Sequence, residues 1–229
     1  MKLFLTSSGL GNHRDKLAKL TDGVRVGLVG NATDDVPAAL RAEWLGETMA
    51  ELRNSGLDVT EIDLRNFWDQ PQLLADTLEG IDICWVGGGN TFLLAQSYVK
   101  SGFAQVAVPK ILSNQLVYAG TSAGSVITSA SLHGIETVDN PKSVADGYNF
   151  DTVWDGLGLL PYNLIPHAGE DPVIDRCEHY FARRNLPYRM LADGDIHVTN
   201  TAGRRTVYTP TIPHTYTPRG TRQGGNFHM

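Results

Sequence analysis

The sequence has 229 residues, 41% hydrophobic and 19% charged, a balance that supplies a full core and excludes a disordered chain. The net charge of −6, without a long run of Lys or Arg, opposes non-specific binding to nucleic acid. No stretch approaches the roughly 18 to 20 apolar residues that cross a bilayer, so we expect no membrane partner.

Short apolar runs alternate with helix-patterned stretches over the first 130 residues. In chain order, we expect a strand at Lys2–Thr6, a strand at Val24–Val29, a helix at Pro37–Asn54, a strand at Val59–Asp63, a helix at Gln72–Leu78, a strand at Ile81–Val86, helices at Thr91–Ser101 and Phe103–Ser113, a strand at Leu116–Ala119 and a helix at Ala123–Ser129. This alternation predicts an α/β fold of three layers, with a mostly parallel sheet covered by helices on both faces. In such sheets, ligands bind at the carboxyl ends of the strands.

The pattern loosens after residue 130. The segment His133–Asn163 is rich in Gly, Asp, Asn and Pro, which predicts a long surface loop with short elements. Beyond it we expect a helix at Asp171–Arg184 and strands at Tyr188–Leu191, Asp195–Thr199 and Thr206–Tyr208, the last two as a hairpin around Ala202-Gly203. We therefore predict a single α/β domain over residues 1–208 and a loosely ordered tail over residues 209–229.

The N-terminus and the two cysteines bear on the cellular compartment. Met1–Ser8 lacks the length of a secretory signal and is expected to form the first strand. Cys84 and Cys177 are isolated in strand-like and helix-like runs, so they predict neither a metal site nor a disulfide framework. We expect both to be structural thiols in a reducing compartment, which predicts a cytoplasmic protein.

The strongest chemical signal is Gly120-Thr121-Ser122-Ala123-Gly124, which follows an apolar strand and opens a helix. A serine in Gly-x-Ser-x-Gly at a strand-to-helix turn sits in a sharp bend with its hydroxyl exposed. The helix N-terminus favours developing negative charge, and the Ala123 N–H is a natural oxyanion donor. The alternative is a plain turn built of small residues.

A second glycine-rich turn, Gly87-Gly88-Gly89-Asn90-Thr91, also lies between a strand and a helix. Successive backbone N–H groups in such a turn can line an anion pocket, here for the oxyanion of a tetrahedral intermediate. A phosphate-binding loop is the rival, although neither the Lys of a P-loop nor the spacing of a dinucleotide fingerprint is present. A plain turn is the third interpretation.

A nucleophilic serine needs a base, which is usually a histidine held by a carboxylate. Of the seven histidines, His167 follows a short apolar run and lies at a strand end, where a catalytic base is expected. His179 lies inside a helix, and His197 alternates with apolar neighbours in a way that predicts exposure to solvent. The candidate acids are Glu136, Asp139, Asp146, Asp155, Asp171 and Asp193, and Asp193 again follows a strand-like run.

Taken together and in this order, the two glycine turns, Pro166-His167 and Asp193-Gly194 resemble the peptidase E family. These are the aspartyl dipeptidases of peptidase family S51, which are related to the cyanophycinases, and the resemblance covers about residues 1 to 208. It implies a fold like the class I glutamine amidotransferases, with Ser122 as nucleophile, His167 as general base and Asp193 in the place of the third, acidic residue, usually Glu. It further implies an oxyanion hole formed by Gly88 or Gly89 and Ala123, and no metal or organic cofactor.

The sequence also departs from the family pattern. The dipeptidases of the family tend to have Trp directly before the nucleophile, whereas this sequence has Thr121, as the cyanophycinases do. The segment from Ser122 to His167 is also longer than in the short dipeptidases. The basic residue that selects aspartate in the family is missing directly after His167, so an acidic substrate side chain has no partner there unless Arg176, the first arginine after His167, reaches it. Glu136 or Asp139 is a candidate for holding the free α-amino group of a peptide, which would limit cleavage to the N-terminal residue. Solvated loop carboxylates are the alternative.

The sequence therefore predicts a serine peptidase that hydrolyses short peptides, acting as a monomer or homodimer. Its expected substrate-binding residues are Asn90, Thr121, Glu136, Asp139 and Arg176. Two other interpretations stay open. One is a cyanophycinase-like or β-aspartyl peptidase, which Thr121 favours. The other is a non-catalytic binding module of amidotransferase-like shape.

Overall fold

The computed structural model describes residues 1–148, 151–200, 202 and 205–208. The predicted tail over residues 209–229 and most of the predicted hairpin turn around Ala202-Gly203 lie outside these residues. The strands are β1 (Lys2–Thr6), β2 (Arg25–Val29), β3 (Asp58–Glu61), β4 (Ile83–Val86), β5 (Val117–Thr121), β6 (Asn163–Ile165), β7 (Tyr188–Met190), β8 (Ile196–Thr199) and β9 (Arg205–Tyr208). The α-helices are α1 (Arg14–Ala18), α2 (Ala38–Asn54), α3 (Pro71–Glu79), α4 (Thr91–Ser101), α5 (Phe103–Leu112), α6 (Ala123–Val126) and α7 (Pro172–Arg183), with 3₁₀ turns at Asn31–Thr33, Leu64–Phe67 and Ile135–Thr137.

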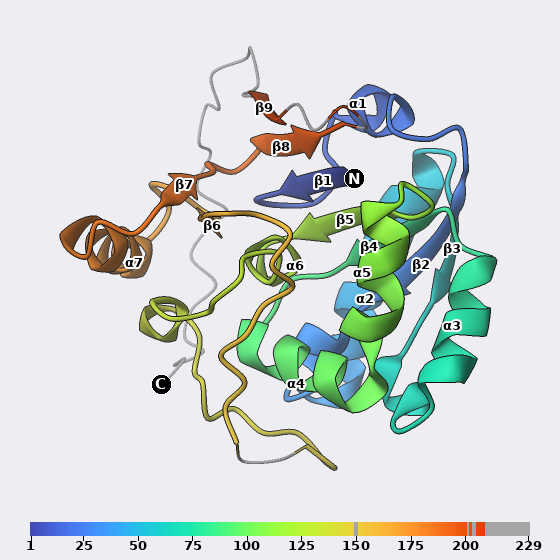
Figure 1. Cartoon of the computed structure of the whole chain (residues 1–229), viewed down its shortest axis with the longest axis horizontal. Coiled ribbons are helices and arrows are strands. Elements are labelled where there is room, and N and C mark those ends of the chain that lie inside the picture. The colour runs from blue at the N-terminus through green and yellow to red at the C-terminus, as the bar shows by residue number, and fades with distance from the viewer. Residues whose placement is uncertain (149–150, 201, 203–204, 209–229) are drawn as a thin grey trace.

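Seven strands form the central sheet, in the order β3-β2-β4-β5-β1-β8-β9 (Figure 1). The strands from β3 to β1 are parallel, whereas β8 and β9 are antiparallel to their neighbours. Strands β6 and β7 pair separately as a parallel two-stranded sheet. The prediction of a mostly parallel sheet in an α/β fold is confirmed.

Both faces of the sheet are packed with apolar side chains. Along β1, Leu3 and Leu5 belong to one hydrophobic cluster and Phe4 to the other, as the alternation of side chains along a strand requires. The first cluster includes residues of α3, α4 and α5, and the second includes residues of α1 and α2. The sheet is therefore the middle of three layers (Figure 1).

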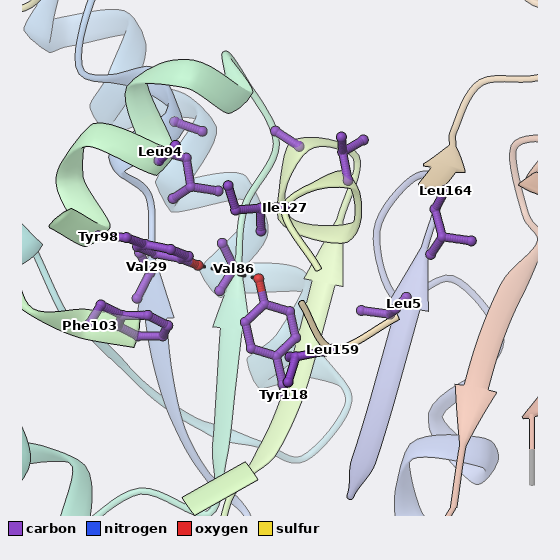
Figure 2. Packing of buried hydrophobic residues seen from close by; sticks show 14 of the residues in the cluster. Leu5, Val29, Val86, Leu94, Tyr98, Phe103, Tyr118, Ile127, Leu159 and Leu164 are labelled. Atoms are coloured by element: carbon purple, nitrogen blue, oxygen red, sulfur yellow. Dashed lines mark hydrogen bonds between the residues drawn. The ribbon is translucent and has the colours of Figure 1, made fainter. Parts of the chain in front are cut away.

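The first cluster also supports the turn that carries Ser122. Figure 2 shows the Tyr98 ring beside Phe103, with ring centroids 4.2 Å apart, and a hydrogen bond of 3.3 Å between the hydroxyls of Tyr98 and Tyr118. The Tyr118 hydroxyl also lies 2.8 Å from the Gly124 carbonyl oxygen, to which it donates. Burial raises the pKa of both tyrosines well above the ordinary value, so they remain neutral donors. The core thus fixes the backbone immediately after the nucleophile.

The parallel strands end at one edge of the sheet. The register pairs Thr6 with Thr121 and Val86 with Gly120, so β1, β4 and β5 finish at the same level. The residues that follow these strands, including Ser7, the Gly87–Gly89 turn and Ser122, are consequently brought together.

Three local predictions need correction. Helix α1 was not predicted, because its five residues contain only one buried apolar residue, Leu17, and so show no helical periodicity. Helix α6 ends at Val126 rather than Ser129, because the N–H groups of Thr128 and Ser129 bond to carbonyls three residues back, at Ser125 and Val126, instead of four.

The third correction concerns His197, which was predicted to face solvent and is fully buried. It lies on β8 between β1 and β9, with the hydroxyls of Tyr162 and Thr199 each 3.4 Å from its Nε2. The alternation of residues in this strand therefore does not mark a solvent-exposed face, because Tyr162 covers that side of β8.

Candidate active site

Ser122 occupies the bend between β5 and α6. Its backbone φ angle of 50° lies in the left-handed region, which residues other than glycine rarely adopt. A Cβ on Gly120 would lie 2.3 Å from the Gly124 carbonyl oxygen, and one on Gly124 would lie 2.3 Å from the Val86 carbonyl oxygen. Both flanking positions therefore require glycine, which is the physical reason for the Gly-x-Ser-x-Gly pattern.

His167 faces Ser122 from the loop that follows β6. Its Nε2 lies 3.0 Å from the Ser122 Oγ, and its own φ of 60° is also in the left-handed region. On the other side of the ring, Nδ1 lies 2.8 Å from Oδ1 of Asp193. When Nδ1 carries the proton it donates to Asp193, which leaves Nε2 free to accept from the Ser122 hydroxyl.

Asp193 lies in the turn between β7 and β8, and 37% of its side chain is exposed. The hydrogen bond with His167 lowers the pKa of this carboxyl below its ordinary value, and a hydrogen bond from Ser7 adds to the effect against the opposing influence of burial. The group is therefore ionised at neutral pH and can stabilise a positive charge on the imidazole.

Ser7 is a part of this site that the sequence analysis missed. It directly follows β1 and is fully buried. Its hydroxyl accepts a bond of 2.7 Å from the His167 backbone N–H and donates a bond of 2.7 Å to Oδ1 of Asp193. Ser7 thus forms hydrogen bonds with both His167 and Asp193, the two residues that extend the line of contacts from Ser122. The available signal was its place at the end of a strand, where Ser122 and His167 also lie.

The glycine turn after β4 packs against the nucleophile. A Cβ on Gly88 would lie 3.0 Å from the Ser122 Cβ, and Gly89 has a φ of 133°. Within the part of the chain that the structure describes, the backbone N–H groups of Gly88, Gly89 and Ala123 have no hydrogen-bond acceptor. These donors beside Ser122 are free to bind an oxygen atom of a ligand.

A small cavity of about 40 Å³ opens beside Ser122 and His167. Most of its lining is apolar, and its polar members besides those two are Thr91 and Asp139. Gly89 and Ala123, whose N–H groups are two of the free donors, also border it. The complete lining is Gly89, Thr91, Ser122, Ala123, Val126, Ile135, Val138, Asp139, Ile165, Pro166, His167, Ile174 and Cys177.

Of the five expected substrate-binding residues, the structure places only Asp139 in this cavity. The Asn90 side chain caps α4 by accepting from the N–H groups of residues 92 and 93, and the Thr121 hydroxyl accepts from the Gly9 N–H at 2.9 Å. Glu136 accepts from the Gly134 N–H at 2.5 Å, and Arg176 is exposed on α7. These four side chains therefore have other contacts or another orientation.

Cys84 and Cys177 are both buried free thiols, and burial raises the pKa of Cys84 to about 12 and that of Cys177 to about 11. Neither is a reactive thiolate at neutral pH.

Among the described residues, no three His, Cys, Asp or Glu side chains are grouped so that they could share a metal ion. No helix of the described residues is both long enough and apolar enough to span a membrane.

The chain is similar to a known protein family and to several named proteins. Residues 3–204 match the model of peptidase family S51. An uncharacterized peptidase of Listeria innocua is 31% identical over 174 residues, which cover 74% of this chain and 78% of the relative. A Drosophila melanogaster protein named as a probable alpha-aspartyl dipeptidase is 30% identical over 119 residues, or 48% of this chain and 46% of that one.

The fold has a counterpart among solved structures. A crystal structure of a Listeria monocytogenes protein assigned to peptidase E superposes with a TM-score of 0.72 at 21% identity, over 92% of this chain and 98% of that one. This likeness confirms the α/β fold, and the family match confirms the resemblance found in the sequence. The chain belongs to peptidase family S51 and is a peptidase related to peptidase E.

Proposed function

We propose that the protein is a serine peptidase that hydrolyses short peptides, with Ser122 as nucleophile, His167 as general base and Asp193 as the acid that orients His167. The observation that carries this proposal is the unbroken line of contacts from Ser122 Oγ to His167 Nε2 at 3.0 Å and from His167 Nδ1 to Asp193 at 2.8 Å. A binding module that had kept only the shape of the fold would have no need for this alignment.

The first half of the reaction forms an acyl-enzyme. His167 Nε2 takes the proton of the Ser122 hydroxyl while Oγ attacks the scissile carbonyl carbon, and the carbonyl oxygen becomes an oxyanion. The N–H groups of Ala123 and of Gly88 or Gly89 donate to this oxyanion, and one such donor is typically worth about 3 kcal/mol. Asp193 stabilises the imidazolium. The proton then passes from His167 to the amine as the C–N bond breaks.

The second half releases the acyl group. A water molecule enters where the amine left, gives a proton to His167 Nε2 and attacks the ester carbon. The Ser122–acyl bond breaks, the proton returns to Ser122 Oγ, and the carboxylic acid departs. The name of the Drosophila relative, a probable alpha-aspartyl dipeptidase, supports a short substrate.

The test combines an activity probe with a peptide panel. A fluorophosphonate probe should label the wild-type protein and should not label Ser122→Ala, and labelling should persist in Ser113→Ala, which changes an exposed serine far from the site. The panel contains Asp-X dipeptides, neutral X-X dipeptides and β-Asp-Arg, of which the last tests the cyanophycinase-like alternative.

We expect Ser122→Ala and His167→Ala to keep the circular dichroism of the wild type and to lose nearly all hydrolysis, because members of a catalytic triad act as a unit. Unchanged turnover in Ser122→Ala would refute the assignment. A wild-type protein that neither reacts with the probe nor cleaves any peptide would favour a binding module instead.

A further inference from the structure

The loop that joins β1 to α1, residues 7–13, lies against the acid of the candidate triad. Ser7 donates to the Asp193 carboxylate, and the next residue, Ser8, forms a second side-chain hydrogen bond with it. The hydrogen bond with His167 lowers the pKa of Asp193 most, and the two serine bonds add to this effect. The start of this β1–α1 loop therefore helps to keep the acid ionised.

Two further bonds of the β1–α1 loop reach the backbone next to the triad. The Gly9 N–H donates to the Thr121 hydroxyl at 2.9 Å, and Thr121 directly precedes Ser122. At the end of the loop, His13 Nε2 lies 2.7 Å from the carbonyl oxygen of Gly194, the residue after the acid. Because a carbonyl oxygen only accepts, this nitrogen carries a proton and donates it. The loop thus connects the strand end of the nucleophile with the turn of the acid.

Glu51 of α2 anchors the middle of the β1–α1 loop. Its Oε1 accepts hydrogen bonds from the N–H groups of Leu10 and Gly11, each at 2.9 Å. The carboxylate packs so closely that a Cβ on Gly9 would lie 2.9 Å from each of its two oxygens. Leu10 itself is fully buried in the second hydrophobic cluster. Glu51 therefore satisfies two backbone donors and fixes the path of the loop between its contacts with the triad.

The position of this loop matters because the nucleophile and the acid lie at the ends of different strands. Ser122 follows β5, whereas Asp193 precedes β8. A catalytic group must be held within about 0.5 Å of its productive position, and a displacement of about 1 Å can cost roughly 10²-fold in rate. A loop that bonds to both strand ends contributes to the distance between them.

We propose that Glu51 and His13 are positioning residues of the triad, which act through the β1–α1 loop to hold Ser122 and Asp193 at the spacing that contact with His167 requires. Neither side chain touches a reacting atom. The kinetic consequence of this inference rests on the proposed function, whereas its consequence for the hydrogen bond between His167 and Asp193 does not.

The kinetic test begins with Glu51. Glu51→Ala should lower kcat about tenfold on the best dipeptide of the panel and change KM by less than about twofold, because the loop acts on the catalytic groups. Glu51→Gln should recover most of this kcat, since its amide oxygen can accept from the same two N–H groups. Glu47→Ala, one turn earlier on α2 and exposed, is the matched control and should keep the wild-type kcat. Wild-type kcat in a folded Glu51→Ala protein would overturn the inference.

His13 tests the other end of the loop. His13→Ala should also lower kcat about tenfold, and His13→Gln should restore it, because the glutamine N–H can donate to the Gly194 carbonyl in the same way. The double variant of Glu51→Ala and His13→Ala should lose less than the product of the two single losses, since both changes release the same loop. Losses that multiply fully would contradict action through a shared loop.

Nuclear magnetic resonance of the protein without substrate distinguishes this inference from the proposed function. The His167 Nδ1 proton, held by Asp193, should give a far-downfield signal that shifts or broadens in Glu51→Ala and is unchanged in Glu47→Ala. Such a change in a protein whose wild type hydrolyses nothing would support the positioning role and refute the peptidase mechanism. An unchanged His167 signal together with a lower kcat in Glu51→Ala would overturn the positioning role and leave the peptidase mechanism in place.

Discussion

The hydroxyl of Ser7 donates a hydrogen bond of 2.7 Å to Oδ1 of Asp193, the same oxygen that lies 2.8 Å from His167 Nδ1. Because Ser7 also accepts from the His167 backbone N–H, one buried side chain holds both the acid and the loop of the base. Ser7 touches no reacting atom, so we regard it as a positioning residue.

Ser7→Ala should lower kcat by about 10- to 100-fold with little change in KM, since small displacements of a catalytic group have large kinetic effects. The substitution also leaves the His167 N–H without its acceptor, which should cost about 1 to 3 kcal/mol of unfolding free energy. Steady-state kinetics and urea unfolding measure the two effects separately. Wild-type kcat in a folded Ser7→Ala protein would show that His167 and Asp193 are positioned without Ser7.

The identity of the acid gives a second prediction. Asp193→Asn removes the charge that stabilises the imidazolium and the acceptor that selects the Nδ1 tautomer, so we expect kcat to fall by roughly 10⁴-fold. Asp193→Glu keeps the charge, but the extra methylene group would displace the carboxylate from its present contacts with both His167 and Ser7. We expect a loss of about tenfold or more in kcat, measured on the best dipeptide of the panel. Full activity of Asp193→Glu would mean that the site adapts to the longer acid usual in the family.

Adjacent glycines should respond differently to the same substitution. A Cβ on Gly89 would lie 2.3 Å from the Ala32 carbonyl oxygen at a positive φ, so Gly89→Ala should cost about 2 to 4 kcal/mol of unfolding free energy. Gly88→Ala places its methyl group 3.0 Å from the Ser122 Cβ, and here we expect a fall of about 10- to 100-fold in kcat/KM with a much smaller loss of stability. Thermal unfolding and kinetics on both variants check the contrast. The reverse ranking of stabilities would contradict the geometry of this turn.

The pH dependence of stability gives a fourth prediction. Burial lowers the pKa of His197 to about 4, and the charges of Arg189 and Arg205 act in the same direction, with Tyr162 as the neutral neighbour that covers the ring. The unfolded chain then binds one more proton than the folded chain between about pH 6.5 and pH 4. Stability should fall with decreasing pH over this window, by at most about 1.4 kcal/mol per pH unit from this residue.

The variant His197→Leu, which cannot be protonated, isolates this contribution. Urea unfolding at several pH values should show a shallower decline for the variant than for the wild type between about pH 6.5 and pH 4. Parallel curves for the two proteins would show that His197 is not responsible for the acid sensitivity.

The sequence predicted most of the central sheet because its strands are continuous apolar runs separated by clear helical patterns. Ser122 and His167 could be proposed from their places at strand ends, and Asp193 was one of six candidate acids that only the family resemblance singled out. The structure brings these three side chains into contact. Their catalytic roles, and the oxyanion roles of Gly88, Gly89 and Ala123, remain predictions that the experiments above address.

Features that depend on tertiary packing could not be predicted in this way. Ser7 contacts His167 only because β1 pairs with β5 and the residue after β1 packs against the loop that carries His167. No local sequence pattern predicts this long-range contact. His197 was misjudged because alternation along a strand shows which residues share a face but not what covers the face.

The active site draws on two separate sheets. Ser122 is attached to the seven-stranded sheet, whereas His167 and Asp193 follow the strands of the two-stranded β6–β7 sheet. Local opening of the smaller unit would separate the base from the nucleophile and leave most of the helical and strand content in place. Enzymatic activity should therefore be lost at a lower denaturant concentration than the far-ultraviolet circular dichroism signal. Residual turnover would consequently underestimate the fraction of molecules in which the seven-stranded sheet is still folded.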